Sequence, residues 1–249
     1  MLTVAVYNLK GGVGKTSAAV NLAYLAALDG YRTVLWDLDP QGGATYLLRA
    51  RPKVKGGAKA LVSKSNALEA RLRGTEFDNL DLLPADPSYR AMDLFLDRTS
   101  HSTRRIADRL RPLAARYDLV VLDCPPSASL VSQAALRAAG LVLVPLIPAT
   151  LSRRTWEQVV GLVQELKPPR PMLLPFLSMV DRRRTLHRGM AEELATQLPA
   201  LARAAIPVSS QVEQMGPRRS PVLTFAARTP AALAYRELWA EVRQRCAGG

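Results

Sequence analysis

The strongest constraint on the fold of this chain is the glycine-rich segment Lys10–Thr16, which reads KGGVGKT. It follows the apolar run Leu2–Tyr7, which has the length and composition of a short buried strand. A strand that enters such a turn and then a helix aims backbone N–H groups and the positive end of the helix dipole at one point. The segment therefore predicts a phosphate site, in which Lys15 neutralises the β- and γ-phosphates and the Thr16 hydroxyl holds Mg²⁺.

The segment departs from the usual pattern G-x-x-x-x-G-K-[ST] at its first position. Leu9 stands where that pattern has glycine, and Lys10 adds a second lysine at the head of the loop. A second lysine beside the phosphates implies a negatively charged group with which it pairs. We expect Lys10 to have a role of its own in the nucleotide site.

Two further runs place carboxylates directly after strands. Residues Arg32–Trp36 read as a strand that ends in DLDPQGG, and Leu119–Leu122 read as a strand that ends in DCPPS. In a parallel sheet the carboxyl ends of the strands form the ligand crevice. An aspartate there can hold the Mg²⁺ ligands or orient a water for attack on the γ-phosphate, whereas one such aspartate alone is as consistent with a turn or helix cap. The three elements in this order favour a nucleotide-hydrolysing site that includes Asp37, Asp39 and Asp123.

The motifs KGGVGKT, DLDPQGG and VVLDCPPS together resemble the deviant Walker A, A′ and B motifs of the ParA/Soj/MinD group of P-loop ATPases. The similarity continues through Leu82–Ala85, through LSMVDRR at Leu177–Arg183 and into the segment Tyr235–Val242, so it covers nearly the whole chain. Within the group, the soluble ParA/Soj partition ATPases match best.

The resemblance implies a role for each matching residue. The nucleotide would be bound by Lys10, Gly11, Gly12, Val13, Gly14, Lys15, Thr16 and Ser17, with Asp181 and Arg183 near the adenine. Mg²⁺ would be held by Thr16, Asp37 and Asp123, and the catalytic residues would be Lys10, Lys15 and Asp39. In this family the lysine that matches Lys10 reaches across an ATP-sandwich dimer to the partner's phosphates, and the aspartate that matches Asp39 positions the attacking water. The cofactors would be ATP and Mg²⁺, and the absence of an N-K-x-D tetrapeptide also favours ATP over GTP.

The pattern along the chain alternates strands and helices. It predicts an α/β fold, a doubly wound and mostly parallel sheet with helices on both faces, as a single P-loop ATPase domain over residues 1–249. Further strands are expected at Leu80–Leu83, Leu141–Leu146 and Met172–Phe176. Helices are expected near Lys15–Asp29, Ser88–Phe95, Ser102–Arg116, Ser129–Ala139, Arg153–Leu166, Leu186–Leu198 and Pro230–Arg245.

The net charge of +13 is unevenly distributed. Residues 1–48 and 75–169 each sum to zero, whereas residues 49–74 carry +7 and residues 170–228 carry +5. Two strongly basic stretches therefore accompany an electrically balanced remainder, which indicates a surface that binds a polyanion. Arginine with few aromatic residues suits contact with phosphates, so binding to DNA would be independent of sequence and sensitive to salt.

In the ParA/Soj family the dimer binds nucleoid DNA through basic residues of the C-terminal half. The matching candidates are Arg182, Arg184, Arg188, Arg203, Arg218, Arg219 and Arg228. The chain has Ser209, Ser210 and Gln211 where family members often carry basic residues. An arginine-rich surface without a DNA role is the alternative.

The basic stretch Arg49–Arg73 immediately follows the Asp39 loop. It is consistent with a second DNA contact, with a docking site for an activating partner, or with a solvated segment. Its composition does not choose among the three.

We expect a slow, partner-stimulated ATPase that closes as a homodimer on ATP, binds nucleoid DNA and is released on hydrolysis. Its partner would be a ParB-like or other cargo-adaptor activator, and its cargo a chromosome, a plasmid or another structure. No apolar run approaches the roughly 20 residues of a membrane span, and Cys124 and Cys246 form no CxxC motif, so a cytoplasmic, nucleoid-associated protein is expected.

Two alternatives remain. One is a nucleotide-gated DNA-binding module whose hydrolysis is incidental. The other is a membrane-associated ATPase like MinD, whose relatives end in an amphipathic helix that inserts into the bilayer. The apolar positions of Tyr235–Val242 recur at helical spacing, which favours a helix that packs on its own sheet over membrane binding.

Overall fold

The computed structural model describes residues 1–63, 68–98 and 102–247. Its strands are β1 (Leu2–Val6), β2 (Thr33–Asp37), β3 (Arg73–Gly74), β4 (Leu80–Leu83), β5 (Leu119–Asp123), β6 (Leu141–Leu146), β7 (Met172–Val180) and β8 (Ala205–Pro207). Its longer helices are α1 (Lys15–Leu28), α6 (Leu130–Ala138), α7 (Ser152–Gln164), α8 (Thr185–Gln197) and α12 (Pro230–Ala247). Its short helices are α2 (Gly43–Leu47), α3 (Gly57–Val62), α4 (Met92–Asp97), α5 (Arg105–Leu110), α9 (Ser210–Glu213), α10 (Met215–Arg218) and α11 (Leu223–Ala226).

The described strands form one sheet in the order β3-β4-β2-β5-β1-β6-β7-β8. Every neighbouring pair is parallel except β3 and β4, which are antiparallel. The chain begins in the middle of the sheet, winds to one edge through β2 and β4, and returns through β5 to build the other half. This arrangement confirms the predicted doubly wound α/β fold.

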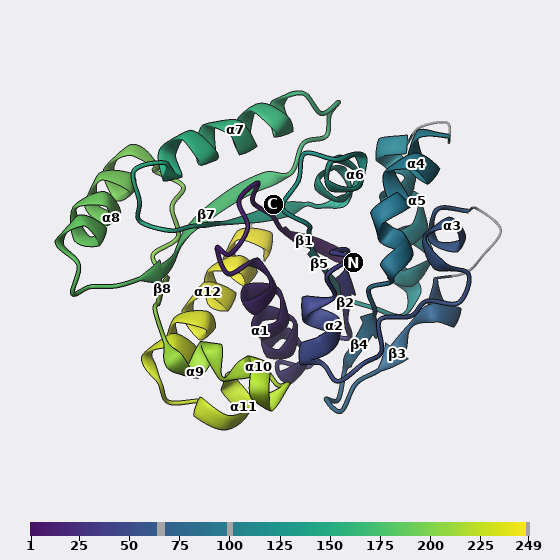
Figure 1. Cartoon of the computed structure of the whole chain (residues 1–249), viewed down its shortest axis with the longest axis horizontal. Coiled ribbons are helices and arrows are strands. Elements are labelled where there is room, and N and C mark those ends of the chain that lie inside the picture. The colour runs from purple at the N-terminus through teal and green to yellow at the C-terminus, as the bar shows by residue number, and fades with distance from the viewer. Residues whose placement is uncertain (64–67, 99–101, 248–249) are drawn as a thin grey trace.

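Helices cover both faces of the sheet, as Figure 1 shows. Alternate residues of a strand point to opposite faces, so Val4 and Val6 of β1 join one core cluster while Ala5 and Tyr7 join the other. Residues of α1, α2, α10, α11 and α12 pack in the first cluster, and residues of α3 to α8 pack in the second. The central strands are buried on both sides, which explains why they read as continuous apolar runs.

Some elements differ from the sequence-based expectations. The segment expected as one helix over Ser102–Arg116 is a 3-10 turn, then α5, then a second 3-10 turn that contains Pro112. Strand β7 runs four residues past the expected end at Phe176. Helix α3 lies inside the basic stretch, where no helix was expected, and packs Ala58 and Leu61 into the core.

Candidate nucleotide-binding and hydrolysis site

The loop between β1 and α1 has the backbone of a phosphate cradle. Gly12 and Gly14 have φ of +70° and +89°, in the left-handed region that glycine adopts without strain. Gly14 caps the N-terminus of α1, so the first N–H groups of that helix face the cavity in front of the loop. An added Cβ at Gly14 would lie 2.8 Å from Ser178 Oγ on β7. The loop is therefore packed closely against β7, and glycine is required for that approach.

Lys15 is buried at the mouth of this loop, with 7% of the residue exposed. Its Nζ donates a hydrogen bond of 2.9 Å to the carbonyl oxygen of Lys10. Burial lowers the pKa of the ammonium, and the carboxylates of Asp123 and Asp39 oppose that shift. The hydrogen-bond acceptor of this buried ammonium is a neutral carbonyl oxygen, and a bound phosphate would give it an anionic partner.

Two aspartates lie side by side at the carboxyl ends of adjacent strands. Asp37 and Asp123 are register partners across β2 and β5, and neither is exposed. The Asp37 carboxylate is occupied by hydrogen bonds, because Oδ2 accepts from the Thr45 N–H and hydroxyl, both at 2.7 Å, and Oδ1 accepts from the Asp39 N–H at 3.2 Å. Burial raises the pKa of Asp37, and the bonds from Thr45 oppose the shift. The geometry makes Asp37 an anchor for α2 and the Asp39 loop.

Asp123 is different, because both of its oxygens are buried and neither has a hydrogen-bond partner of ordinary geometry among the described residues. Burial raises the pKa of Asp123 far above its usual value, Asp37 adds to the shift, and Thr16 and Lys15 act against it. A bound cation would offset the free-energy cost of keeping this buried carboxylate ionised. Among the described residues no group of three or more His, Cys, Asp or Glu side chains is placed to hold a metal. The buried Asp123 carboxylate beside the phosphate loop suits an ion such as Mg²⁺, which is held by one or two carboxylates and keeps several waters and phosphate oxygens.

Asp39 faces the phosphate loop from the end of β2. Its Oδ1 accepts a hydrogen bond of 2.9 Å from the Gln41 N–H, which orients the carboxylate. The side chain lines the same cavity as Lys15 and Thr16. A carboxylate in this position can orient a water for in-line attack on a terminal phosphate.

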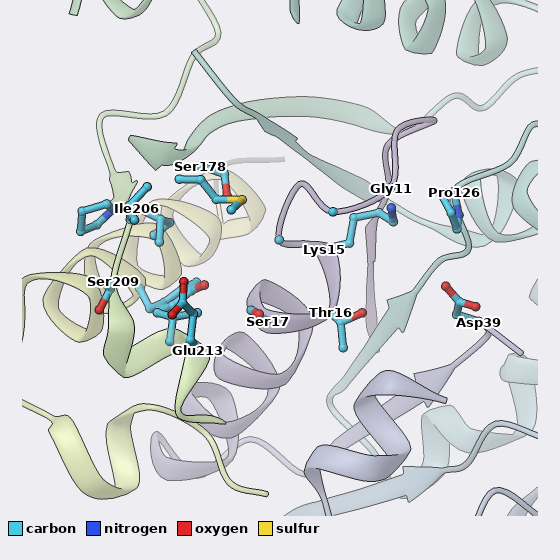
Figure 2. Close-up of a pocket in the computed structure, with 17 residues that line it drawn as sticks. Gly11, Lys15, Thr16, Ser17, Asp39, Pro126, Ser178, Ile206, Ser209 and Glu213 are labelled. Carbon is cyan, nitrogen blue, oxygen red and sulfur yellow. The ribbon is translucent and has the colours of Figure 1, made fainter. Parts of the chain in front are cut away.

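These elements enclose a cavity of about 390 Å³ (Figure 2). Of the residues expected in the nucleotide site, Gly11, Gly12, Gly14, Lys15, Thr16, Ser17 and Asp39 line it. Figure 2 shows Lys15 in the middle, with Asp39 on one side and Ser209 and Glu213 on the other. The phosphate loop and Asp39 therefore form one end of the cavity, and the C-terminal part of the chain forms the other.

The rest of the cavity lining consists of residues that the sequence analysis did not assign to the nucleotide site. Pro126 lies beside Gly11 and Asp39 (Figure 2). The others are Ser178, Met179, Ile206, Pro207, Val208, Ser209, Val212, Glu213 and Tyr235. Met179 has a left-handed φ of +56° at a register shift between β7 and β8, so a bulge turns the two strands at the cavity wall. This wall is formed by segments that are far apart in the sequence, and no local pattern predicts a positive φ at a methionine. These residues could therefore not be identified from the sequence.

The other expected nucleotide residues lie outside this cavity. Val13 is buried behind the loop, and Lys10 is exposed at its rim next to Leu151, which is 61% exposed. Asp181 and Arg183 form an ion pair of 2.9 Å and line a neighbouring cavity of about 520 Å³, which shares Pro207, Val208 and Glu213 with the first. Their role near the adenine stays a prediction.

The arginines expected to bind DNA fall into separate groups. Arg182, Arg184 and Arg188 are exposed at the start of α8, Arg203 is exposed before β8, and Arg228 is exposed before α12. Arg218 and Arg219 lie at α10, where their guanidinium groups cover Phe225 and Tyr46 at 4.7 Å and 4.6 Å from the ring centroids.

Known proteins with similar sequences and structures support a common family. A family model described as "AAA domain" matches residues 1–172. The chromosome partitioning protein ParA of Caulobacter vibrioides is 32% identical over 254 residues, which cover 97% of this chain and 94% of that protein. The sporulation initiation inhibitor protein Soj of Bacillus subtilis is 29% identical over 253 residues, 96% of this chain and 97% of that protein.

A solved structure shares the whole fold. It is a cobyrinic acid a,c-diamide synthase from Mycobacterium smegmatis with a bound ATP analogue and magnesium. It has a TM-score of 0.83 and 28% identity, and the match covers 100% of this chain and 97% of that one. With the phosphate loop and paired aspartates described above, these similarities confirm the expected resemblance: the chain belongs to the ParA/Soj family of partition proteins, P-loop proteins with an AAA domain.

Proposed function

We propose that this protein is a Mg²⁺-dependent ATPase that hydrolyses ATP slowly and uses ATP to control its binding to DNA. The observation that carries the proposal is the arrangement of Lys15 and Thr16 in a glycine cradle, opposite Asp39 and close to the fully buried carboxylate of Asp123. Relatives solved with an ATP analogue and magnesium, or with ADP and magnesium, support the choice of ligands.

Each residue has a distinct task in this proposal. The backbone N–H groups of Gly11 to Thr16 bind the phosphates, and Lys15 exchanges the Lys10 carbonyl for phosphate oxygens. Thr16 and Asp123 would hold Mg²⁺, with Asp37 next to Asp123 as the third expected residue, and the ion would neutralise charge on the β- and γ-phosphates. Asp37 stays bonded to Thr45 and fixes the start of the loop that carries Asp39. Asp39 would orient the attacking water and accept its proton as the water oxygen bonds to the γ-phosphorus and the bond from that phosphorus to the bridging oxygen of the leaving ADP breaks.

ATP would also close two copies of the chain into a dimer. Lys10 is exposed and does not line the cavity of its own subunit, which supports a role at the phosphates of a second subunit. Exposed Leu151 beside it supplies apolar area for such a contact. The closed dimer would join the basic surfaces of both copies and bind DNA without sequence preference.

Hydrolysis, stimulated by a ParB-like or other cargo adaptor, would open the dimer and release it from DNA. Repeated binding and release would then position a cargo along the nucleoid. The name of the ParA relative, a chromosome partitioning protein, supports chromosome partition as the process, with a plasmid or another cargo as variants of the same cycle.

Three substitutions test the site. Lys15→Ala should abolish ATP-dependent dimerisation, measured by light scattering. Asp39→Ala should bind ATP like the wild type, hydrolyse it much more slowly and remain on DNA as a dimer. Lys10→Ala should bind ATP but lose dimerisation and stimulated turnover. Rapid turnover by the Asp39→Ala protein would contradict the assignment.

The two alternatives give different results. If hydrolysis is incidental to a nucleotide-gated DNA-binding module, Asp39→Ala should leave both turnover and ATP-dependent DNA binding unchanged. A MinD-like protein should sediment with anionic liposomes in ATP and lose this on deletion of residues 235–249. The apolar side chains of α12, including Tyr235, Leu238 and Val242, are buried in the core, which favours a docked helix. Within residues 1–63, 68–98 and 102–247, no helix is long and apolar enough to cross a membrane.

A further inference from the structure

The two basic stretches, far apart in the sequence, meet at one surface of the fold. Arg49 follows α2 and donates hydrogen bonds to the carbonyl oxygens of Arg218 at 3.1 Å and Arg219 at 3.2 Å. Arg219 in turn donates to the carbonyl oxygen of Tyr46 at 2.9 Å and covers its ring. Both arginines have a left-handed backbone, with φ of 57° and 50°. These reciprocal contacts fix positive charge from both halves of the chain side by side.

The surface continues along the segment after α2. Arg51, Lys53 and Lys55 are exposed there. The segment is held by its backbone, because the Arg73 guanidinium donates to the Lys53 carbonyl at 2.6 Å and the Arg71 guanidinium to the Lys55 carbonyl at 3.1 Å. We name this surface the basic strip and define it as Arg49, Arg51, Lys53, Lys55, Arg73, Arg218 and Arg219.

The strip encloses a depression and has little opposing charge. A cavity of about 360 Å³ is lined by Arg49, Arg51 and Arg73 together with Glu76. Glu76 pairs with Arg49 at 3.4 Å, and no other ion pair to a residue of the strip is found in the described part of the chain. Grouping like charges in this way is unfavourable in the isolated protein. A polyanion along the strip would relieve that repulsion.

The chemistry of the strip favours phosphates over a protein partner. Protein interfaces are centred on buried aromatic and aliphatic side chains. None of the large apolar side chains exposed on the described residues lies within residues 49–63 or 68–76. Tyr46, which borders the strip and is 52% exposed, has the Arg219 guanidinium over its ring. A surface made mainly of arginine and lysine, with its bordering aromatic ring covered by a cation, matches the contacts that proteins make with the DNA backbone.

We propose that the basic strip binds the phosphodiester backbone of duplex DNA, as a contact separate from the arginines of α8. The inference rests on the proposed function, and it assigns the stretch after the Asp39 loop to DNA. Gly42 of that loop immediately precedes α2, and α2 ends at the strip. The DNA contact and the water-positioning loop therefore belong to one short segment, anchored at Asp37 by Thr45.

The test is a triple substitution, Arg51→Gln with Lys53→Gln and Lys55→Gln, in the full-length protein. The hydrogen bonds to Arg71 and Arg73 use backbone carbonyls of this segment, so its fold should persist. A matched control removes three exposed charges elsewhere, by Arg98→Gln, Arg154→Gln and Lys167→Gln. Circular dichroism and basal ATP hydrolysis without DNA should be unchanged in both proteins.

Binding to a random-sequence duplex in ATP is measured by fluorescence anisotropy across a salt series. Each lost phosphate contact reduces the steepness of the plot of log K against log salt by about 0.9. The triple variant should therefore lose about 2 to 3 from the slope for each subunit whose strip contacts the duplex, while the control keeps the wild-type slope. Equal slopes and affinities in the two variants would overturn the inference and leave the proposed function standing.

Two other outcomes would also overturn the inference. A wild-type protein that binds no duplex in any nucleotide state would remove the inference and the DNA role together. A triple variant that binds duplex normally but loses binding to poly-L-glutamate, which the wild type and control retain, would assign the strip to an acidic protein partner.

Discussion

Thr45→Val tests whether the internal anchor of Asp37 stabilises the fold as an ionised group. Thr45 is fully buried, and its hydroxyl donates to Asp37 Oδ2 at 2.7 Å and accepts from the Ala85 N–H at 2.8 Å. Valine keeps the shape of threonine and removes both bonds. A hydrogen bond to a charged group contributes about 1.5–3 kcal/mol, and a buried N–H left without an acceptor costs about 1–3 kcal/mol. We therefore expect a loss of about 3 kcal/mol in the free energy of unfolding, measured by urea denaturation.

Thr45→Ser is the matched control, because serine keeps the hydroxyl and removes one methyl group. Its cost should be about 1 kcal/mol, from lost apolar burial. Equal costs for the two variants would refute the role given to the hydroxyl.

The same pair of variants has a predicted dependence on pH. The pKa of Asp37 is higher in the folded protein than in the unfolded chain, so the folded state binds more protons between the two pKa values. The contribution of Asp37 to the free energy of unfolding therefore falls as the pH rises from the unfolded pKa through the folded pKa. The Thr45 hydroxyl opposes that fall by bonding to the ionised carboxylate. The excess cost of Thr45→Val over Thr45→Ser should therefore shrink between about pH 8 and about pH 5. A cost independent of pH would mean that Asp37 does not change its protonation state in the folded protein over this range, contrary to its raised pKa.

Two further substitutions follow from the packing around the nucleotide loop. Gly14→Ala places a Cβ at a residue with a left-handed backbone and against Ser178 Oγ, so it should lower the free energy of unfolding by at least about 1–2 kcal/mol. Gly11→Ala is the control, because its Cβ meets open space, and it should be tolerated in urea denaturation. Equal losses in the two variants would contradict this packing. Asn21→Leu leaves the buried Val222 N–H without its 3.0 Å acceptor and should cost about 1–3 kcal/mol, and unchanged hydrogen exchange at that amide would refute the role of Asn21 in holding α11.

The phosphate loop and the sheet could be predicted because both depend on local sequence. A glycine pattern after a strand specifies its own turn, and continuous apolar runs such as Leu119–Leu122 specify central strands. The position of Asp37 and Asp123 at one edge of the sheet also followed from the sequence, since both end parallel strands, whereas the direct pairing of their strands is seen only in the structure.

The opposite wall of the cavity could not be predicted, because it depends on contacts between distant segments. Glu213 and Ser209 reach the nucleotide cavity only because β8 pairs with β7 and α12 packs beside α1. Helix α3 was missed because two glycines and three lysines around it suggest a loop, whereas burial of Leu61 and neighbouring apolar residues stabilises the helix. The meeting of Arg49 with α10 likewise has no signature along the chain.

The central claim is that ATP controls binding to DNA, and the most direct test compares one duplex of random sequence in ATP, in ADP and without nucleotide. The measurement is repeated across a salt series. The account predicts tight, sequence-independent binding in ATP alone, which weakens steeply as salt rises. Equal binding in all three nucleotide conditions, or no binding in any of them, would contradict it.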